Sequence, residues 1–251
     1  MLCEIALTVS ESKRLIAKGV AALPAVKKAL ADGTVAIATG STNAYVVEEI
    51  TGQAIDKNKY MTGATLPAGV SRKGLLSREL PDVVLKQGKR VENAASTDAI
   101  TEMGVGDVFM KGANALHYET RRAGVLIGHP TGGTVGATLG TIIARRITLV
   151  IPVGLEKSVA QPLEEAFTFL RSDAEASGNV PALWPLNGEI VTEIEALKVL
   201  TGVDAVQTGA GGLAGAEGAV WLALRGDKKQ VDAATRLVES IQGEPPFVSA
   251  P

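Results

Sequence analysis

The stretch Asp107-Val-Phe-Met-Lys-Gly-Ala-Asn-Ala-Leu116 is followed, after a short polar connector, by Ala123-Gly-Val-Leu-Ile-Gly-His-Pro-Thr-Gly-Gly-Thr134 and a segment rich in small residues. Each stretch predicts a short buried strand that ends in a polar, glycine-containing turn, and the second turn precedes a helix. Such turns favour binding of a small anion, because glycines and helix N-termini present backbone N–H groups. Together they predict an α/β sheet with an anion site at the carboxyl ends of its strands.

The segments on either side of this stretch continue the alternation of strands and helices. Residues 12–31 have apolar side chains at helical spacing, with Ser10 or Ser12 as the expected cap and Pro24 as a point where the helix kinks or splits. The alternation implies parallel strands joined by right-handed crossovers. The expected helices are 12–31, 44–51, 96–103 and 134–144, and the expected strands are 34–39, 108–110, 124–127 and 147–153.

The pattern of the remaining residues predicts a smaller unit in which helices and strands no longer alternate regularly. The expected elements there are helices over 159–177, 189–200 and 228–242, strands over 203–208 and 219–224, and a Pro-rich loop over 179–187. We therefore expect an α/β fold with a Rossmann-like, mostly parallel sheet covered by helices on both faces, plus a small C-terminal α+β unit. The expected domains are 1–178, which binds the ligand, and 179–251, which packs on it. The pattern of residues 53–93 does not predict a definite structure, although residues 59–66 and 82–91 could each form a strand.

Composition excludes several classes of partner. The 251 residues carry 25 basic and 27 acidic side chains, a formal charge of −2, so there is no concentrated basic face for nucleic acid or an anionic membrane. No apolar run reaches the roughly 20 residues that a membrane-spanning helix needs. A single cysteine, Cys3, allows no internal disulfide, and we expect a cytoplasmic protein.

Two glycine turns are the expected ligand-binding segments. Gly40, Ser41 and Thr42 lie between an expected strand and an expected helix, where glycine lets the backbone approach a ligand and the hydroxyls donate; the alternative is that a hydroxyl only caps the helix. The second turn contributes Thr131, Gly132, Gly133 and Thr134. Its spacing does not match a dinucleotide fingerprint, so a nucleotide-binding domain is the weakest reading.

Lys111, Gly112 and Asn114 follow the strand of the opening stretch and complete the expected binding set. Lys111 would hold an anion or a carbonyl oxygen; the alternative is a solvated surface lysine. Proton transfer requires an acid or base within hydrogen-bond reach, and the catalytic candidates are Glu119, His129 and Glu217. The spacing of the two histidines and the cysteine indicates no metal site, and no motif indicates a cofactor.

Taken in order, these motifs resemble the superfamily of sugar-phosphate isomerases and CoA transferases, which includes ribose-5-phosphate isomerase. The resemblance covers roughly residues 10 to 155 and rests on the 40–42 turn, the 107–116 stretch and the helix start at 132–134. It implies that the first turn holds a phosphate and that residues 111–115 line the substrate pocket. Many members carry a catalytic Asp in a Gly-Ala-Asp turn, where this chain has Gly112-Ala-Asn114, and Asn cannot act as a general base.

Two hypotheses follow from the binding residues and the missing acid. The first is an enzyme that binds a small phosphorylated or carboxylated metabolite and performs aldose–ketose-type isomerase chemistry. The second is a non-catalytic ligand-binding or sensing protein on the same scaffold, and both are compatible with a homo-oligomer. Because one scaffold supports many chemistries, the residues of the site must decide between them.

Overall fold

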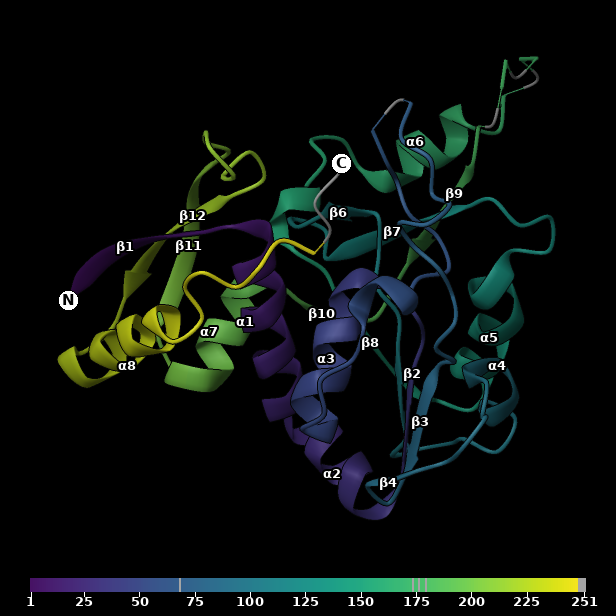
Figure 1. The fold of residues 1–251 in the computed structure, drawn as a ribbon, viewed down its shortest axis with the longest axis horizontal. Helices are drawn as coiled ribbons and strands as arrows, with labels where there is room; N and C mark the ends of the chain where they lie inside the picture. The colour runs from purple at the N-terminus through teal and green to yellow at the C-terminus, as the bar shows by residue number, and fades with distance from the viewer. Residues whose placement is uncertain (68, 173, 176, 179, 248–251) are drawn as a thin grey trace.

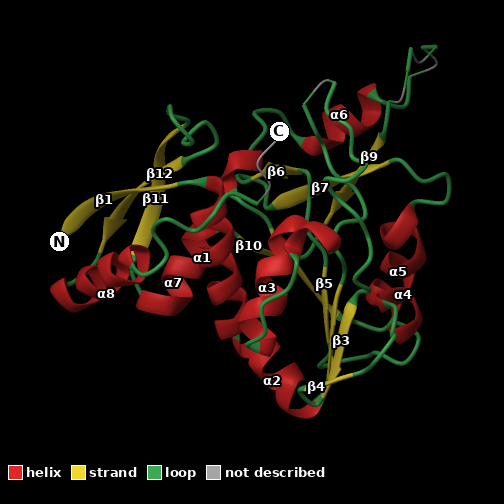
Figure 2. Cartoon of the chain, in the orientation of Figure 1, coloured by secondary structure: helices red, strands yellow, loops and turns green. Residues whose placement is uncertain are grey.

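The structure, a computed structural model, describes residues 1–67, 69–172, 174–175, 177–178 and 180–247 (Figures 1 and 2). Within these residues the largest sheet has six strands in the order β10-β8-β5-β2-β3-β4. Its strands are β2 (Thr34–Ile37), β3 (Val83–Lys86), β4 (Lys89–Arg90), β5 (Val108–Met110), β8 (Thr148–Pro152) and β10 (Glu189–Val191). β10, β8, β5 and β2 are parallel, whereas β3 and β4 form an antiparallel hairpin beside β2. The coarse α/β prediction is confirmed, and the sheet is mixed.

The parallel strands are short apolar runs because both of their faces are buried. In β5, Val108 and Met110 face one hydrophobic cluster and Phe109 faces the other. Figure 2 shows the helices that cover the two faces. One side is covered by α1 (Val9–Ala22), α2 (Pro24–Asp32) and α3 (Ser41–Thr51), and the other by α4 (Ser96–Ala99) and α5 (Gly133–Ala144).

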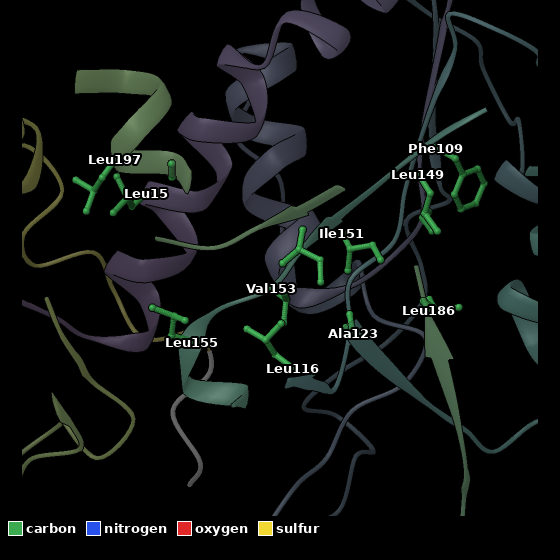
Figure 3. Packing of buried hydrophobic residues seen from close by; sticks show 14 of the residues in the cluster. Leu15, Phe109, Leu116, Ala123, Leu149, Ile151, Val153, Leu155, Leu186 and Leu197 are labelled. Carbon is green, nitrogen blue, oxygen red and sulfur yellow. The ribbon is translucent and has the colours of Figure 1, made fainter. Parts of the chain in front are cut away.

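A second sheet lies at the carboxyl ends of the parallel strands, at the top of Figure 1. It is antiparallel and consists of β6 (Ala115–His117), β7 (Arg122–Ile127) and β9 (Ala182–Leu186). Figure 3 shows its Leu116, Ala123 and Leu186 packed in the same hydrophobic cluster as Phe109 and Ile151 of the main sheet. This small sheet therefore covers the strand ends where the sequence places a site.

The small sheet corrects two sequence-based expectations. The strand at 124–127 was expected in the parallel sheet; it is instead part of the antiparallel β6–β7 pair, because the connection over 118–121 is too short for a parallel crossover. The loop expected at 179–187 contains β9. The helix expected at 159–177 is represented by α6 (Leu163–Phe169), and residues 173, 176 and 179 of these two segments lie outside the described residues.

The third sheet combines the two ends of the chain. The strands predicted at 203–208 and 219–224 are confirmed as the antiparallel pair β11 (Asp204–Ala210) and β12 (Val220–Arg225), and β1 (Leu2–Leu7) pairs with β12. The expected helix over 189–200 comprises strand β10 and helix α7 (Glu193–Thr201), and α8 (Lys228–Glu239) follows β12. Strands from both sides of residue 178 thus share sheets.

Helix ends follow local capping rules. Thr8, rather than Ser10 or Ser12, caps α1: its hydroxyl accepts from the Glu11 N–H and the Glu11 carboxylate accepts from the Thr8 N–H, a capping box. Pro24 starts α2, where its missing N–H costs nothing. Gly52 ends α3 with φ of 67°, a left-handed conformation that favours glycine. Two short 3-10 turns, η1 (Lys57–Lys59) and η2 (Leu155–Lys157), complete the elements.

Candidate functional site

The carboxyl ends of the four parallel strands bring four polar segments together. Residues 38–40 follow β2, residues 111–112 follow β5, residues 153–157 follow β8, and residues 192–193 follow β10. Hydrogen bonds continue the pairing beyond the strands: the N–H of Ala38 donates to the Met110 carbonyl and that of Lys111 to the Val150 carbonyl. Ligands of α/β proteins usually bind at such an edge.

Three lysines and two glutamates gather at this edge, and we call them the lysine–glutamate cluster. Its members are Lys13 on α1, Lys111 after β5, Glu156 and Lys157 in η2, and Glu193 at the first position of α7. Lys13 is only 8% exposed, and Lys111 and Lys157 are partly buried.

The environment of the lysines disfavours their charged form. Burial lowers the pKa of Lys111 to about 8, and the neighbouring charge of Lys157 adds to this effect while Asp82 opposes it. Burial also lowers the pKa of Lys13 to about 8, against the attraction of Glu156. The pKa of Lys157 is lowered by burial too, although Glu156 and Glu193 oppose the shift. Desolvation is thus the dominant cause in all three.

The ammonium groups are not neutralised by direct ion pairs. Lys111 Nζ donates to the Gly112 carbonyl at 3.2 Å, and Lys157 Nζ donates to the Ala113 carbonyl at 2.8 Å. Among the described residues, none of the three lysines has a carboxylate oxygen within ion-pair distance. Partly desolvated cations in this state attract an anion strongly, because little else in the site compensates their charge.

The two glutamates of the cluster differ in burial. Glu193 is 0% exposed, and its Oε2 accepts from the Leu155 N–H at 3.0 Å. Burial, aided by the nearby charge of Glu156, raises the pKa of Glu193 to about 7. Glu156 is half-buried. Glu193 Oε1 and Glu156 Oε2 are both buried without a hydrogen-bond partner in the described part of the chain, which is rare for native polar atoms.

The turn after β2 lies beside this cluster. Gly40 begins α3 without a side-chain cap, so the alternative in which Ser41 or Thr42 caps the helix does not hold. The Thr39 N–H donates to Asp82 Oδ1 at 3.0 Å, and the pKa of Lys111 responds to Asp82. The structure therefore brings together two of the predicted binding segments, residues 40–42 and 111–112.

The other predicted binding turn lies elsewhere. Because β7 belongs to the antiparallel sheet, the expectation that residues 131–134 share one sheet edge with residues 40–42 is wrong. Gly132 lies against Gly136 and the ring of Trp184, and Thr131 is exposed. His129 is exposed, and its Nδ1 lies 2.9 Å from the Thr131 hydroxyl. Ligand binding by Thr131, Gly132, Gly133 and Thr134 stays a prediction without a link to the cluster.

The remaining predicted residues have local contacts. Asn114 Oδ1 accepts from the Leu126 N–H at 3.0 Å, next to the β6–β7 pair. Glu119 is exposed in the turn after β6. Glu217 is exposed between β11 and β12, where its carboxylate accepts from the Gly215 N–H at 2.9 Å. No hydrogen bond or ion pair between described residues joins Glu119, Glu217 or His129 to the cluster, and their catalytic roles stay predictions.

Sequence reasoning missed four members of the cluster. Glu156 and Lys157 lie in the first turn after the buried strand β8, a signal similar to the one that identified Lys111, and could have been found. Glu193 was missed because residues 189–200 were predicted as one helix, so no strand end was expected just before it. Lys13 lies in an amphipathic helix, where a lysine is usually expected on the solvated face, yet residues 10–13 are all buried.

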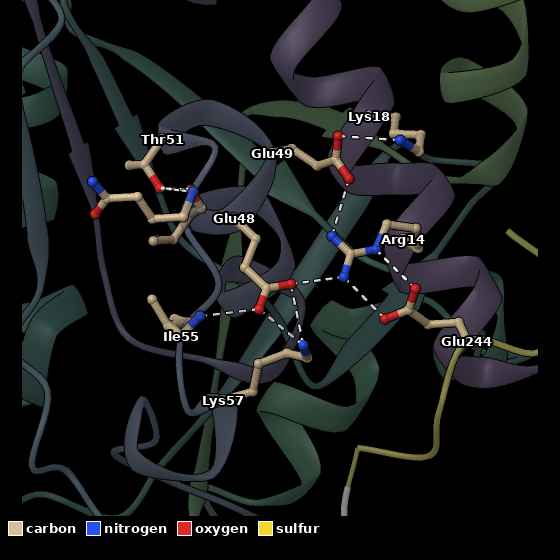
Figure 4. Close-up of polar contacts among 10 residues, drawn as sticks. Arg14, Lys18, Glu48, Glu49, Thr51, Ile55, Lys57 and Glu244 are labelled. Atoms are coloured by element: carbon tan, nitrogen blue, oxygen red, sulfur yellow. Dashed lines mark hydrogen bonds and ion pairs between the residues drawn. The ribbon is translucent and has the colours of Figure 1, made fainter. Parts of the chain in front are cut away.

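A second group of charges is adjacent to the first, and we call it the Arg14 network. The Arg14 guanidinium donates to Glu48 at 2.7 Å, to Glu49 at 3.0 Å and to both carboxylate oxygens of Glu244, while Lys57 pairs with Glu48 (Figure 4). Here every carboxylate has a cationic partner, so this network serves packing of α1 on α3.

Comparison with known proteins returns no match: no family model, no curated protein and no solved structure matches this chain. No helix of the described residues is both long and apolar enough to cross a membrane. Across the same residues, no group of three or more His, Cys, Asp or Glu side chains is placed to hold a metal ion. The candidate function therefore rests on the geometry of the lysine–glutamate cluster.

Proposed function

We propose that the protein binds a small phosphorylated or carboxylated metabolite at the lysine–glutamate cluster and performs isomerase-type proton transfer on it. The observation that carries the proposal is the set of three partly desolvated ammonium groups without ion-pair partners. Three lysines oppose at most two carboxylates, and with its pKa near 7 Glu193 is partly protonated at neutral pH. The cluster is therefore net positive, and a bound anion would compensate it.

The turn after β2 supports binding from a second side. The first N–H groups of α3 have no side-chain cap, and they carry the positive end of the helix dipole. A Cβ at Gly40 would meet no atom within 4 Å, so this turn has open space beside it. These features support our assignment of ligand binding to Gly40, Ser41, Thr42, Lys111 and Gly112.

Binding is testable with sulfate, because sulfate remains a dianion across the pH range of interest. We expect Lys111→Met to weaken sulfate binding by about 10-fold, as for the loss of one charge-assisted hydrogen bond. Lys157→Met should act in the same direction, and isothermal titration calorimetry at low ionic strength measures both. Lys86→Met, which changes an exposed lysine on β3, is the matched control and should bind as the wild type does. Equal loss in all three variants would contradict a specific site.

Chemistry is testable by hydrogen exchange. An isomerase that works through proton transfer exchanges the hydrogen beside the carbonyl of an aldose phosphate with solvent deuterium, and proton NMR detects the loss of that signal. Exchange that depends on Lys111 supports the enzyme. Saturable binding with no exchange for a panel of aldose and ketose phosphates would favour the alternative, a ligand-binding or sensing protein.

A further inference from the structure

We propose that Glu156 is the residue that moves the proton at this site, and that Glu193 is a positioning residue that holds a proton behind it. The assignment deepens the proposed function and rests on it. Neither residue belongs to the set that the sequence singled out. Three features support the assignment: the different accessibility of the two carboxylates, their unsatisfied oxygens and the space at Gly154.

Accessibility separates the two carboxylates. Glu193 is 0% exposed and its Oε2 is held by the Leu155 N–H, so it cannot touch a ligand. Glu156 precedes Lys157 in η2, is half-buried, and acts electrostatically on Lys13, Lys157 and Glu193. It therefore interacts both with the cationic groups that would hold the anion and with the buried acid. A proton-transferring group must lie within reach of the bound ligand.

The unsatisfied oxygens support the assignment of a proton to Glu193. Glu156 Oε2 and Glu193 Oε1 are both buried without a partner among the described residues. Two nearby carboxylates in a poorly solvated site do not both ionise readily, so one retains a proton. The raised pKa of Glu193 agrees with Glu193 as the protonated member. Lys13 from α1 and Lys157 from η2 interact electrostatically with Glu156, Lys111 interacts with Lys157, and the Ser12 hydroxyl lies near Glu193.

The resulting step is balanced without any co-reactant. The Glu156 carboxylate removes the proton from the carbon beside the substrate carbonyl, and the C–H electron pair shifts to give an enediolate. The lysines stabilise the developing negative charge on oxygen. The hydroxyl proton of that carbon passes to the former carbonyl oxygen, and Glu156 returns its own proton to the former carbonyl carbon. The carbonyl thereby moves by one position and the enzyme is left unchanged.

Gly154 explains how Glu156 reaches its position. A Cβ on Gly154 would overlap the Glu156 carboxylate. The backbone there has φ of −77° and ψ of 150°, which any residue adopts, so glycine is needed for space alone. Gly154→Ala is therefore a variant that displaces the Glu156 carboxylate without changing any charge, and it should fold.

The shared proton is tested first, in the absence of substrate. Carbon-13 NMR of protein labelled at the glutamate carboxyls should show one carboxyl that titrates near neutral pH. That resonance should be missing in Glu193→Gln, and in Glu156→Gln its pKa should fall toward the ordinary range because the neighbouring charge is gone. If all glutamates titrate in the ordinary acid range, or the resonance survives in Glu193→Gln, the assignment is wrong.

The catalytic role is tested with sulfate and an aldose phosphate on the same variants. Glu156→Gln should still bind sulfate and should lose deuterium exchange by at least about 100-fold, the usual contribution of a general base. Glu156→Asp should restore part of the exchange, and Gly154→Ala should reduce it. Glu193→Gln should shift the pH profile of exchange, an effect that a purely structural residue would not produce. Glu239→Gln, at an exposed position of α8, is the control.

The outcomes separate this inference from the proposed function. Failure to bind sulfate contradicts the anion site. The NMR titration then decides separately whether Glu193 holds a proton near neutral pH. Sulfate binding with wild-type exchange in Glu156→Gln overturns the role of Glu156. Sulfate binding with no exchange in the wild-type protein, for every aldose and ketose phosphate in the panel, overturns it as well.

Discussion

Lys13 and Arg14 are consecutive residues of α1, yet they belong to opposite electrostatic environments. Arg14 donates to three glutamates within hydrogen-bond distance (Figure 4). Lys13 is 8% exposed and has no ion-pair partner in the described part of the chain. Its Nζ lies over the ring of Phe247, 5.6 Å from the ring centroid. Adjacent residues of a helix point in different directions. The side chain of Arg14 therefore reaches carboxylate partners, whereas that of Lys13 reaches none among the described residues.

The pKa shifts show the same difference. For Arg14, burial is the largest single influence and lowers the pKa, but the hydrogen bonds to Glu244, Glu48 and Glu49 together raise it above its ordinary value. For Lys13, burial lowers the pKa to about 8 and the attraction of Glu156 does not restore it. The hydrogen bonds of the Arg14 network stabilise the charged form of Arg14. In the lysine–glutamate cluster, burial destabilises the charged forms of the lysines.

The comparison indicates which cluster contributes to stability and which to function. Unfavourable charges persist in folded proteins mainly where a ligand or a reaction requires them, and perturbed pKa values therefore gather at functional sites. Removing a charge from the Arg14 network should destabilise the protein. Removing one from the lysine–glutamate cluster should stabilise it while weakening ligand binding. Stability measurements on three variants, in order of decreasing effect, test this reversal of sign.

The largest effect is expected for Arg14→Met. The substitution leaves three carboxylates close together and poorly solvated, since the side chains of Arg14, Glu48 and Glu244 are only 14%, 10% and 15% exposed. We expect a loss of about 4 kcal/mol, as for other broken buried ion pairs. Urea unfolding near neutral pH measures it. Lys228→Met, which removes an exposed pair with Asp232, should cost less than about 1 kcal/mol; a similar loss in both variants would contradict the special status of the Arg14 network.

Glu193→Gln should change stability in the opposite direction and only at higher pH. The pKa of Glu193 is about 7 in the folded state against an ordinary 4.5, so between these values the folded protein holds a proton that the unfolded chain has released. The stability of the wild type therefore falls as the pH rises from 4.5 to about 7. Above that range the glutamine variant should be more stable by about 3 kcal/mol. Urea unfolding at acidic and at mildly alkaline pH checks the dependence, and a gain that is equal at both would contradict it.

The sequence predicted much of the parallel core, because its strands and helices are specified locally. The buried strand over 108–110, the helix after Gly40 and the end of that helix at Gly52 all depend on apolar runs and glycine positions near one another in the chain. β7 and β9 were misplaced because their partners are set by tertiary pairing between residues 122–127 and 182–186, which no local pattern encodes.

The site was predicted less completely than the fold. Lys111 and the 40–42 turn follow recognisable strand ends, so the strand pattern indicates them. Glu193 and Lys13 are identified only by burial, and burial of a charged residue is a property of the packed molecule. An amphipathic helix predicts a solvated lysine at position 13, because the sequence does not show that Phe247 lies beside it or that Glu156 and Lys157 are close enough to act on it.

The smallest stability change is expected for Lys13→Met, which keeps the apolar stem of the side chain and removes the charge. The pKa of Lys13 is lowered from 10.5 to about 8, which corresponds to about 3 kcal/mol of unfavourable burial for the charged form. Loss of the contact over the Phe247 ring offsets about 1 kcal/mol of this, so the variant should gain about 2 kcal/mol near neutral pH.

The gain from Lys13→Met should shrink as the pH rises from about 8 to 10.5, because over that range the folded wild type has released the proton that the unfolded chain still binds. Thermal or urea unfolding at neutral and at alkaline pH checks this dependence. The same variant should bind sulfate more weakly, since it removes one of the cationic groups. If the variant were less stable and bound sulfate as the wild type does, Lys13 would belong with Arg14 among the charges that stabilise the fold. The proposed difference between these two adjacent residues would then be wrong.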